Sequence, residues 1–122
     1  MEYVRVELDN IRSGEATFKE IREVIEDAGK NGFKYAGYLP AVIGPSGKIL
    51  SYDLIMKPEL DVVEYAFEKV EAENNVLTNA RFDGYKEIID SYEDKDYDFC
   101  GIVPVRMGPS GKILEIELVF AK

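Results

Sequence analysis

The seven residues GPSGKIL occur twice in this chain, at positions 44–50 and again at 108–114. When the chain is aligned with itself at this offset, residues 1–58 face residues 65–122 without a gap, and 17 of the 58 pairs are identical. The identities extend from one end of the unit to the other, which a chance alignment does not produce. We infer a tandem duplication, with a first repeat at 1–58 and a second at 59–122, packed as one globule.

The first repeat has the pattern of a strand, a helix and two further strands. In YVRVEL, at 3–8, apolar and polar residues alternate as they do in a half-buried strand. In EATFKEIREVIEDAGKNG, at 15–32, apolar residues recur at helical spacing. YAGYLPAVI, at 35–43, predicts a second strand, and GPSGK suits a tight hairpin turn into a third. The fold class expected is therefore α+β, built from tandem β-α-β-β units in antiparallel-rich sheets.

The second repeat reads in the same way, with one ambiguity. ELDVVEYAFEKV has both strand and helix character, and its alignment with YVRVEL decides for a strand at 62–72. A helical stripe follows, at Phe82, Tyr85, Ile88, Ile89 and Tyr92. Ser13 in the first repeat, and Thr78 or Asn79 in the second, are candidate helix N-caps.

Proline predicts the order of the strands. Pro40 and Pro104 lie within the second strand of each repeat, and a residue without an N–H is tolerated at a sheet edge or a bulge. This favours the order 1-3-2 in each repeat, with the second strand outermost. The short link KPELD then leads into a separate sheet, so we expect two three-stranded sheets with two helices, related by a pseudo-twofold axis.

Composition excludes several classes of function. The chain has no histidine, which rules out histidine triads and most zinc sites. Its single cysteine, Cys100, excludes an internal disulfide, fits a reducing cytoplasm, and is interpreted as a small buried apolar residue. No apolar run is long enough to span a membrane. The expected localisation is cytoplasmic, without membrane association.

The net charge of −9 is unevenly distributed. Residues 1–61 carry 11 acids and 8 bases, a balance of −3, whereas the remainder carries 13 acids and 7 bases, a balance of −6. Phosphates repel such a protein, so direct nucleic-acid binding is not expected. The excess acid either serves solubility or forms a surface that occupies a basic partner.

The arrangement of the repeat resembles the small family catalogued as domain of unknown function 4177. The segments that carry the resemblance are EYVRVEL, EDAGKNGFKYAGYLP and ILSYDLIMK in the first repeat, with DSYEDKDYDFCGIVP and ILEIELVFAK in the second. The family usually has Gly-Trp after the helix, where this chain has Gly32-Phe33 and then Asp96-Tyr97. The resemblance implies the fold and no particular activity.

Six residues are candidate binding residues. Ser46 with Lys48, and Ser110 with Lys112, could hold an anion at the two GPSGK turns. The spacing is not that of a phosphate loop and no helix follows, so hairpin chemistry explains the same residues. Two identical turns could also form twin contact points. Tyr38 and Tyr52 belong to a tyrosine-rich sheet face suited to a protein or a flat ring.

No metal or cofactor is expected. Asp94, Asp96 and Asp98 alternate as in a calcium loop, but Phe99 replaces the required glycine and Val105 the bidentate glutamate. A solvated acidic loop explains them, with weak cation binding left open.

Three functions remain open. The first is a non-enzymatic binding or interaction module that takes a protein partner or self-associates, as in a homodimer formed through an edge strand or a tyrosine-bearing face. The second is an acidic inhibitor or immunity-type protein that blocks a basic partner such as a nuclease. The third is a small-molecule binder, or a carboxylate-based enzyme, with a pocket between the repeats. We rank them in this order and do not expect catalysis.

Overall fold

A computed structural model of the chain describes residues 1–12, 15–74 and 80–122, with side chains outside 9–15 and 74–79. Each half contains a strand, a short hairpin, a helix and two long strands. In the first half these are β1 (Glu2–Glu7), β2 (Asp9–Arg12), β3 (Glu15–Thr17), α1 (Ile21–Lys30), β4 (Phe33–Ile43) and β5 (Ile49–Pro58). In the second half they are β6 (Tyr65–Glu71), β7 (Glu73–Asn74), β8 (Ala80–Arg81), α2 (Tyr85–Glu93), β9 (Asp98–Met107) and β10 (Ile113–Ala121). The fold is therefore α+β and rich in antiparallel sheet, as the sequence predicts.

The strand order 1-3-2 is present in both halves. Sheet A has the order β1-β5-β4, and the second half contributes β6-β10-β9 to sheet B. The strand reading of 62–72 is also confirmed, because β6 pairs with β10 over Tyr65–Glu71. All of these pairings are antiparallel.

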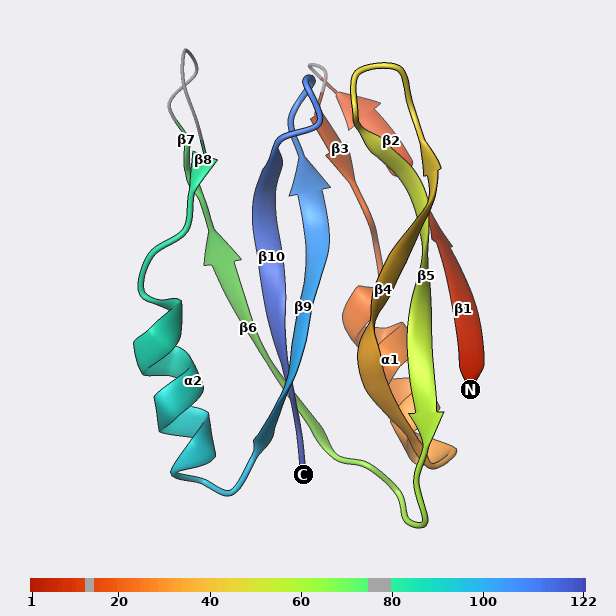
Figure 1. The fold of residues 1–122 in the computed structure, drawn as a ribbon, viewed down its shortest axis with the longest axis vertical. Helices are drawn as coiled ribbons and strands as arrows, with labels where there is room; N and C mark the ends of the chain where they lie inside the picture. Colours follow the sequence, from red (N-terminus) through yellow and green to blue (C-terminus); the bar gives the residue numbers. More distant parts are fainter. Residues whose placement is uncertain (13–14, 75–79) are drawn as a thin grey trace.

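The expectation of two three-stranded sheets is wrong, because β3 of the first half crosses to the second. It pairs with β9, so that sheet B becomes five-stranded in the order β2-β3-β9-β10-β6. The second strand is consequently outermost in sheet A, where β4 is the edge, but not in sheet B. In the second half, β7 and β8 form a separate two-stranded sheet beyond the end of β6 (Figure 1).

Both helices begin later than the sequence pattern suggests. The segment predicted as the first helix starts with β3, and α1 begins only at Ile21. Glu20 occupies the N-cap position of α1 with a left-handed backbone at φ 60°, and Gly84 precedes α2 at φ 80°. The N-cap candidates Ser13, Thr78 and Asn79 lie outside the described residues. Phe18 and Phe82 precede the helices instead of lying on them.

The contact between the halves joins two different kinds of face. The first half contributes the face of sheet A that carries α1, including Tyr52 and Leu54. The second half contributes the face of sheet B that lacks a helix, including Val103, Met107 and Val119, all with no exposed surface. A pseudo-twofold axis would bring equivalent faces together, so the predicted twofold relation does not describe this contact.

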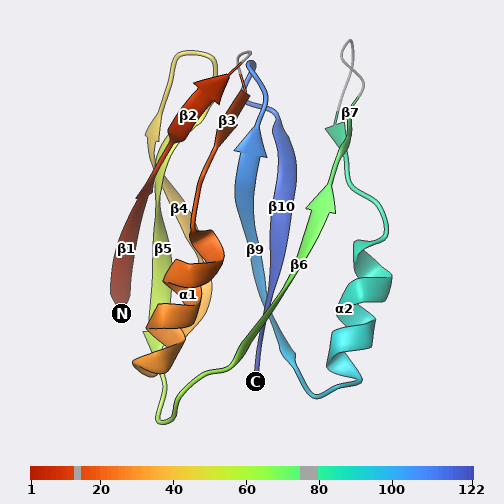
Figure 2. The ribbon, with the colours of Figure 1, turned by 180° about the vertical axis from the view of Figure 1, so that it is seen from behind.

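A second and smaller core lies on the other face of sheet B, beneath α2. Ile116, Leu118 and Phe120 of β10 point to this side and pack with partly buried residues of α2. In Figure 1 and in the reverse view of Figure 2, α2 flanks β6 at the margin of the molecule, whereas α1 lies against the strands of sheet A. None of the residues of α2 is fully buried, whereas Ile21, Ile25 and Gly29 of α1 are. The two helices are thus covered to very different extents.

Candidate functional site

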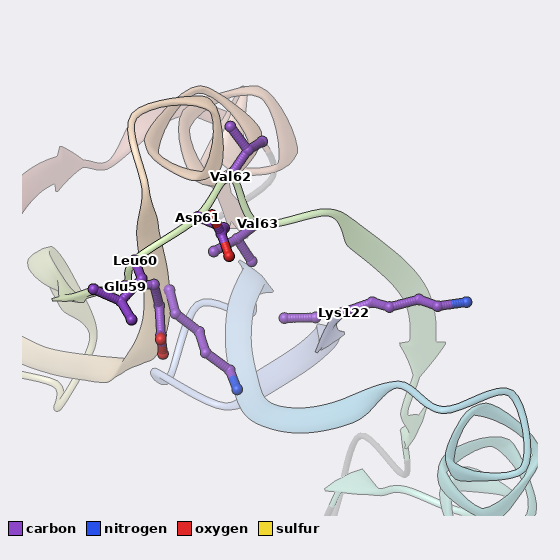
Figure 3. Close-up of a pocket in the computed structure, with 8 residues that line it drawn as sticks. Glu59, Leu60, Asp61, Val62, Val63 and Lys122 are labelled. Carbon is purple, nitrogen blue, oxygen red and sulfur yellow. The ribbon is translucent and has the colours of Figure 1, made fainter.

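Among the surface depressions lined by described residues are three of note, and the first lies at the link between the halves. It has a volume of about 310 Å³ and is lined by residues 59–63, Lys34, Ala121 and Lys122. Figure 3 shows the linking segment passing over it, with Glu59 and Lys122 among the side chains at its margin. The Lys34 ammonium donates to Asp98 at 3.1 Å, and this hydrogen bond raises the pKa of Lys34. This ion pair joins β4 of sheet A to β9 of sheet B beside the link.

The main chain of the link is also held at both ends. The amide of Glu59 donates to the carbonyl of Gly32 at 2.7 Å, and that of Val63 donates to Gly29 at 3.0 Å. Glu64 and Lys122 exchange hydrogen bonds of 3.2 and 2.9 Å. Leu60 is nevertheless fully exposed. The segment is an anchored connection rather than a group of side chains converging on a ligand.

The second depression lies at the N-terminus of α1, between the halves. It has a volume of about 410 Å³ and contains mainly charged groups. The Arg22 guanidinium donates twice to the Glu117 carboxylate, at 2.8 and 3.0 Å, and the Glu117 side chain is only 4% exposed. Burial raises the pKa of Glu115, against the opposing effects of Lys69 at 3.7 Å and Arg106 at 4.0 Å. The Arg22–Glu117 pair joins α1 to β10 across the halves, whereas Lys69, Arg106 and Glu115 all belong to the second half. These charges therefore have partners within the depression itself.

The two GPSGK turns lie against each other. A Cβ added to Gly111 would stand 2.8 Å from the carbonyl carbon of Gly47, so the two backbones touch directly. Ser46 and Ser110 are exposed, and Lys48 and Lys112 are half-buried. The structure therefore brings the four predicted turn residues to the same end of the molecule, and their role in anion binding stays a prediction.

The two candidate tyrosines occupy the core between the halves. The Tyr52 side chain has no exposed surface, and its hydroxyl donates to the carbonyl of Pro104 at 2.8 Å. Tyr38 is half-buried and packs edge-on against Tyr52, with ring centroids 5.5 Å apart. Burial raises the pKa of both phenols. The Tyr52 hydroxyl thus links sheet A to β9 by a hydrogen bond.

Cys100 and Asp98 lie on β9, and Asp94 and Asp96 lie between α2 and β9. Cys100 is partly buried, and burial raises the pKa of its thiol, which opposes formation of a thiolate. Within the described parts of the chain, no cluster of acidic or cysteine side chains could hold a metal ion. Asp94, Asp96 and Asp98 are all exposed, and the acidic-inhibitor reading stays a prediction. Neither helix is long and apolar enough to cross a membrane, over the residues that the structure places.

The third depression is an apolar groove between α2 and sheet B, which we call the α2 groove. It has a volume of about 430 Å³ and is lined by Phe82, Tyr85, Ile89, Phe99, Ile102, Ile113, Ile116 and Leu118. The Phe99 ring is 39% exposed although it packs on Phe120 at 5.6 Å. The lining residues carry no charge, so the groove suits an apolar occupant rather than an ion.

The first half contains the same groove in covered form. Shifted by 64 positions, Phe82, Tyr85, Ile89 and Phe99 correspond to four side chains that are at most 4% exposed: Phe18, Ile21, Ile25 and Tyr35. The second half covers them, through β9 and the helix-free face of sheet B. The equivalent residues in the second half have no such cover among the described residues. The α2 groove is therefore an uncovered copy of a core interface.

Sequence reasoning found the apolar stripe of α2 but not the groove. The stripe matches that of α1, so both helices were expected to be equally covered. The tandem order alone does not reveal the groove, because two units can pack by like or by unlike faces, and only packing by unlike faces leaves one face of each kind uncovered.

Comparison of the chain with protein-family models, with curated proteins and with solved structures finds no match. The resemblance to domain of unknown function 4177 therefore stays a prediction. The α2 groove is the candidate site that the geometry itself provides.

Proposed function

We propose that this chain is a non-enzymatic protein-interaction module that binds through the α2 groove. Its ligand is a β-sheet of another polypeptide, which lays an aliphatic face over the groove and an open edge strand beside β8. The observation that carries this proposal is the covered groove of the first half, whose occupant is a sheet face of this kind.

Two further features support a sheet as the occupant. β8 is short and, over the described residues, pairs only with β7. Its counterpart β3 pairs with β9, and Phe18 extends that pairing by donating to the carbonyl of Val105 at 3.0 Å. An incoming edge strand beside β8 would satisfy main-chain groups in the same way.

The lining of the groove argues against catalysis there. General acid–base or nucleophilic chemistry needs titratable groups within hydrogen-bonding reach of one another. The only titratable side chain in the lining is Tyr85, among aliphatic and phenylalanine side chains. Apolar burial is what such a surface can contribute to binding, at about 25 cal/mol per Å².

Photo-crosslinking in living cells tests the proposal. Tyr85 in the groove is replaced by p-benzoylphenylalanine, an aromatic residue of similar shape, and Asp94 on the exposed turn after α2 receives the same residue as the control. We expect a discrete adduct at Tyr85 and none at Asp94, with the crosslinked peptide mapping to an aliphatic β-strand of another chain. Protein adducts no more frequent at Tyr85 than at Asp94 would contradict the proposal.

A further inference from the structure

We infer that the polypeptide that covers the α2 groove is a second copy of this chain, bound head to tail. This inference rests on the proposed function and names its partner. The surface that enters the groove is the outer face of sheet A, which we define as Tyr3, Leu39, Ile43, Asp53 and Ile55, together with the open edge of β4.

The contact inside one chain serves as the template. There, the helix-free face of the second half covers the helix-bearing face of the first half, with Val103, Met107 and Val119 entirely buried. Repeating the same relation once more requires a helix-bearing face from a second half and a helix-free face from a first half. Both surfaces exist uncovered on this chain.

The exposed apolar residues of the first half are those that the repeated contact would bury. Leu39 and Ile43 are 57% and 59% exposed, whereas their counterparts Val103 and Met107 have no exposed surface. Tyr3, the counterpart of the partly buried Phe67, is 61% exposed. Exposed apolar side chains that share one face of a sheet indicate an interaction surface.

The unpaired edges match as well. Inside the chain, Ala16 and Thr17 of β3 pair with Met107 and Arg106 of β9. The equivalent pairing joins Ala80 and Arg81 of β8 to Ile43 and Val42 of a neighbour. β4 is the edge strand of sheet A, and residues 39–43 are exposed along it. An apolar open edge of this length favours pairing with another chain.

Charge and volume are complementary across the repeated contact. The pair Arg22–Glu117 inside the chain corresponds to Lys86 with Asp53 of the neighbour, again a cation and a carboxylate. Asp53 already pairs with Arg5 on the outer face of sheet A, so Lys86 would join an existing ion pair. In the groove, Tyr85 stands where the first half has Ile21, and Ile116 stands where it has Tyr52. One aromatic and one aliphatic side chain are thus present in both halves, with their positions exchanged.

The contact between chains is weaker than the contact within one. Tyr35 and Tyr52 donate hydroxyl hydrogen bonds to Ile102 and Pro104 across the halves. Their counterparts Phe99 and Ile116 have no hydroxyl. The assembly is consequently reversible with concentration, whereas the halves stay joined.

Because the two surfaces differ, a dimer of this kind leaves one of each uncovered. Heterologous contacts of this type grow into closed rings or open chains rather than stopping at two. The sequence led us to consider a homodimer, and a homodimer with twofold symmetry is the main competing arrangement.

Sedimentation velocity over a range of concentrations tests the inference with two variants. Phe99→Asp places a charge in the groove, and Ile43→Asp places one on the outer face of sheet A. Both side chains are exposed in the single chain, so each variant should keep the far-ultraviolet circular dichroism of the wild type. We expect the wild type to form oligomers larger than a dimer and each variant alone to remain monomeric.

Mixing the two variants gives the decisive result. Each retains the surface that the other has lost, so the mixture should form a 1:1 heterodimer and nothing larger. A wild type that is monomeric at every concentration would overturn the inference. So would a variant that still assembles alone, as one of the two would if a twofold dimer formed through a single one of these surfaces, or a mixture that stays monomeric.

A charge reversal supplies a milder perturbation that does not endanger folding. Lys86→Glu should weaken assembly about 2–5-fold, which is the usual effect of one exposed ion pair. Lys95→Glu makes the same change of charge on the turn after α2, and it should leave assembly unchanged. Equal effects of the two reversals would contradict the assigned contact.

Crosslinking at Tyr85 separates the two proposals: adducts to another protein overturn self-assembly alone, and the lack of protein adducts overturns both.

Discussion

Replacement of Gly111 by alanine should destabilise the protein much more than the same change at Gly47, although both glycines lie in an identical GPSGKIL string. Both have φ of 84°, in the left-handed region that an L side chain occupies at a cost of about 1 kcal/mol. At Gly47, a Cβ would meet no atom within 4 Å. At Gly111, it would lie 2.8 Å from the carbonyl carbon of Gly47 and from the amide nitrogen of Lys48.

The size of the difference follows from that overlap. Ordinary carbon contacts begin near 3.4 Å, so the two turns would have to separate, and both consist of backbone that cannot rotate away. Overpacking of this kind costs about 1–3 kcal/mol. We therefore expect Gly47→Ala to lower the free energy of unfolding by about 1 kcal/mol and Gly111→Ala to lower it by about 2–4 kcal/mol.

Urea denaturation followed by far-ultraviolet circular dichroism measures both changes, because the chain has no tryptophan to report by fluorescence. Dilute protein keeps the measurement on the single chain. Equal losses for the two variants would refute the argument, since they would show that the turns do not touch. A large loss of unfolding free energy for Gly47→Ala alone would show that the close contact involves a Cβ at Gly47 and not one at Gly111.

Further predictions concern the tyrosines and the start of α1. Tyr52→Phe should cost about 1–3 kcal/mol in urea denaturation, because a buried carbonyl loses its donor, whereas Tyr3→Phe on the exposed face should cost nothing measurable. Glu20→Gly should stabilise the protein by about 1 kcal/mol, since it relieves a left-handed residue where the second half has Gly84, and a lower thermal midpoint would contradict this. Burial raises the pKa of Tyr65 to about 12, so the native state holds this proton more tightly than the unfolded chain. The contribution of Tyr65 to stability should then be constant below about pH 10 and be lost as the pH rises towards 12, and absorbance of phenolate at 295 nm that develops fully before circular dichroism is lost would refute the prediction.

The order of elements was predictable because it depends on local patterns. Alternation in YVRVEL, the turn chemistry of GPSGK and the prolines of the second strands are properties of neighbouring residues, and they indicated strands, hairpins and the order 1-3-2. The late start of α1 was not predictable from the apolar stripe alone. Phe18 has helical spacing with Ile21 and Ile25, but it follows β3, whose partner β9 is about 90 residues away in the chain.

The candidate groove was hidden for a related reason. Ile25 and Ile89 are identical in type and equivalent in the repeat, yet Ile25 is entirely buried and Ile89 only partly. Burial depends on which surface lies opposite, and that surface comes from a distant part of the chain. No pattern within either repeat distinguishes the two positions.

The amino-acid sequence by itself determined the strands, the hairpins and the acidic, histidine-free chemistry, because these follow from side-chain type and short-range geometry, and its repeated pattern predicted a tandem duplication. Tertiary structure decided that the two units pack by unlike faces and that β3 joins the other half's sheet. It also decided that Tyr52 lies inside the core and donates a hydrogen bond to the other half. Two copies of one surface can meet like to like or front to back, and the choice depends on the sum of many long-range contacts. The uncovered groove beneath α2 and the exposed face of sheet A follow from that choice.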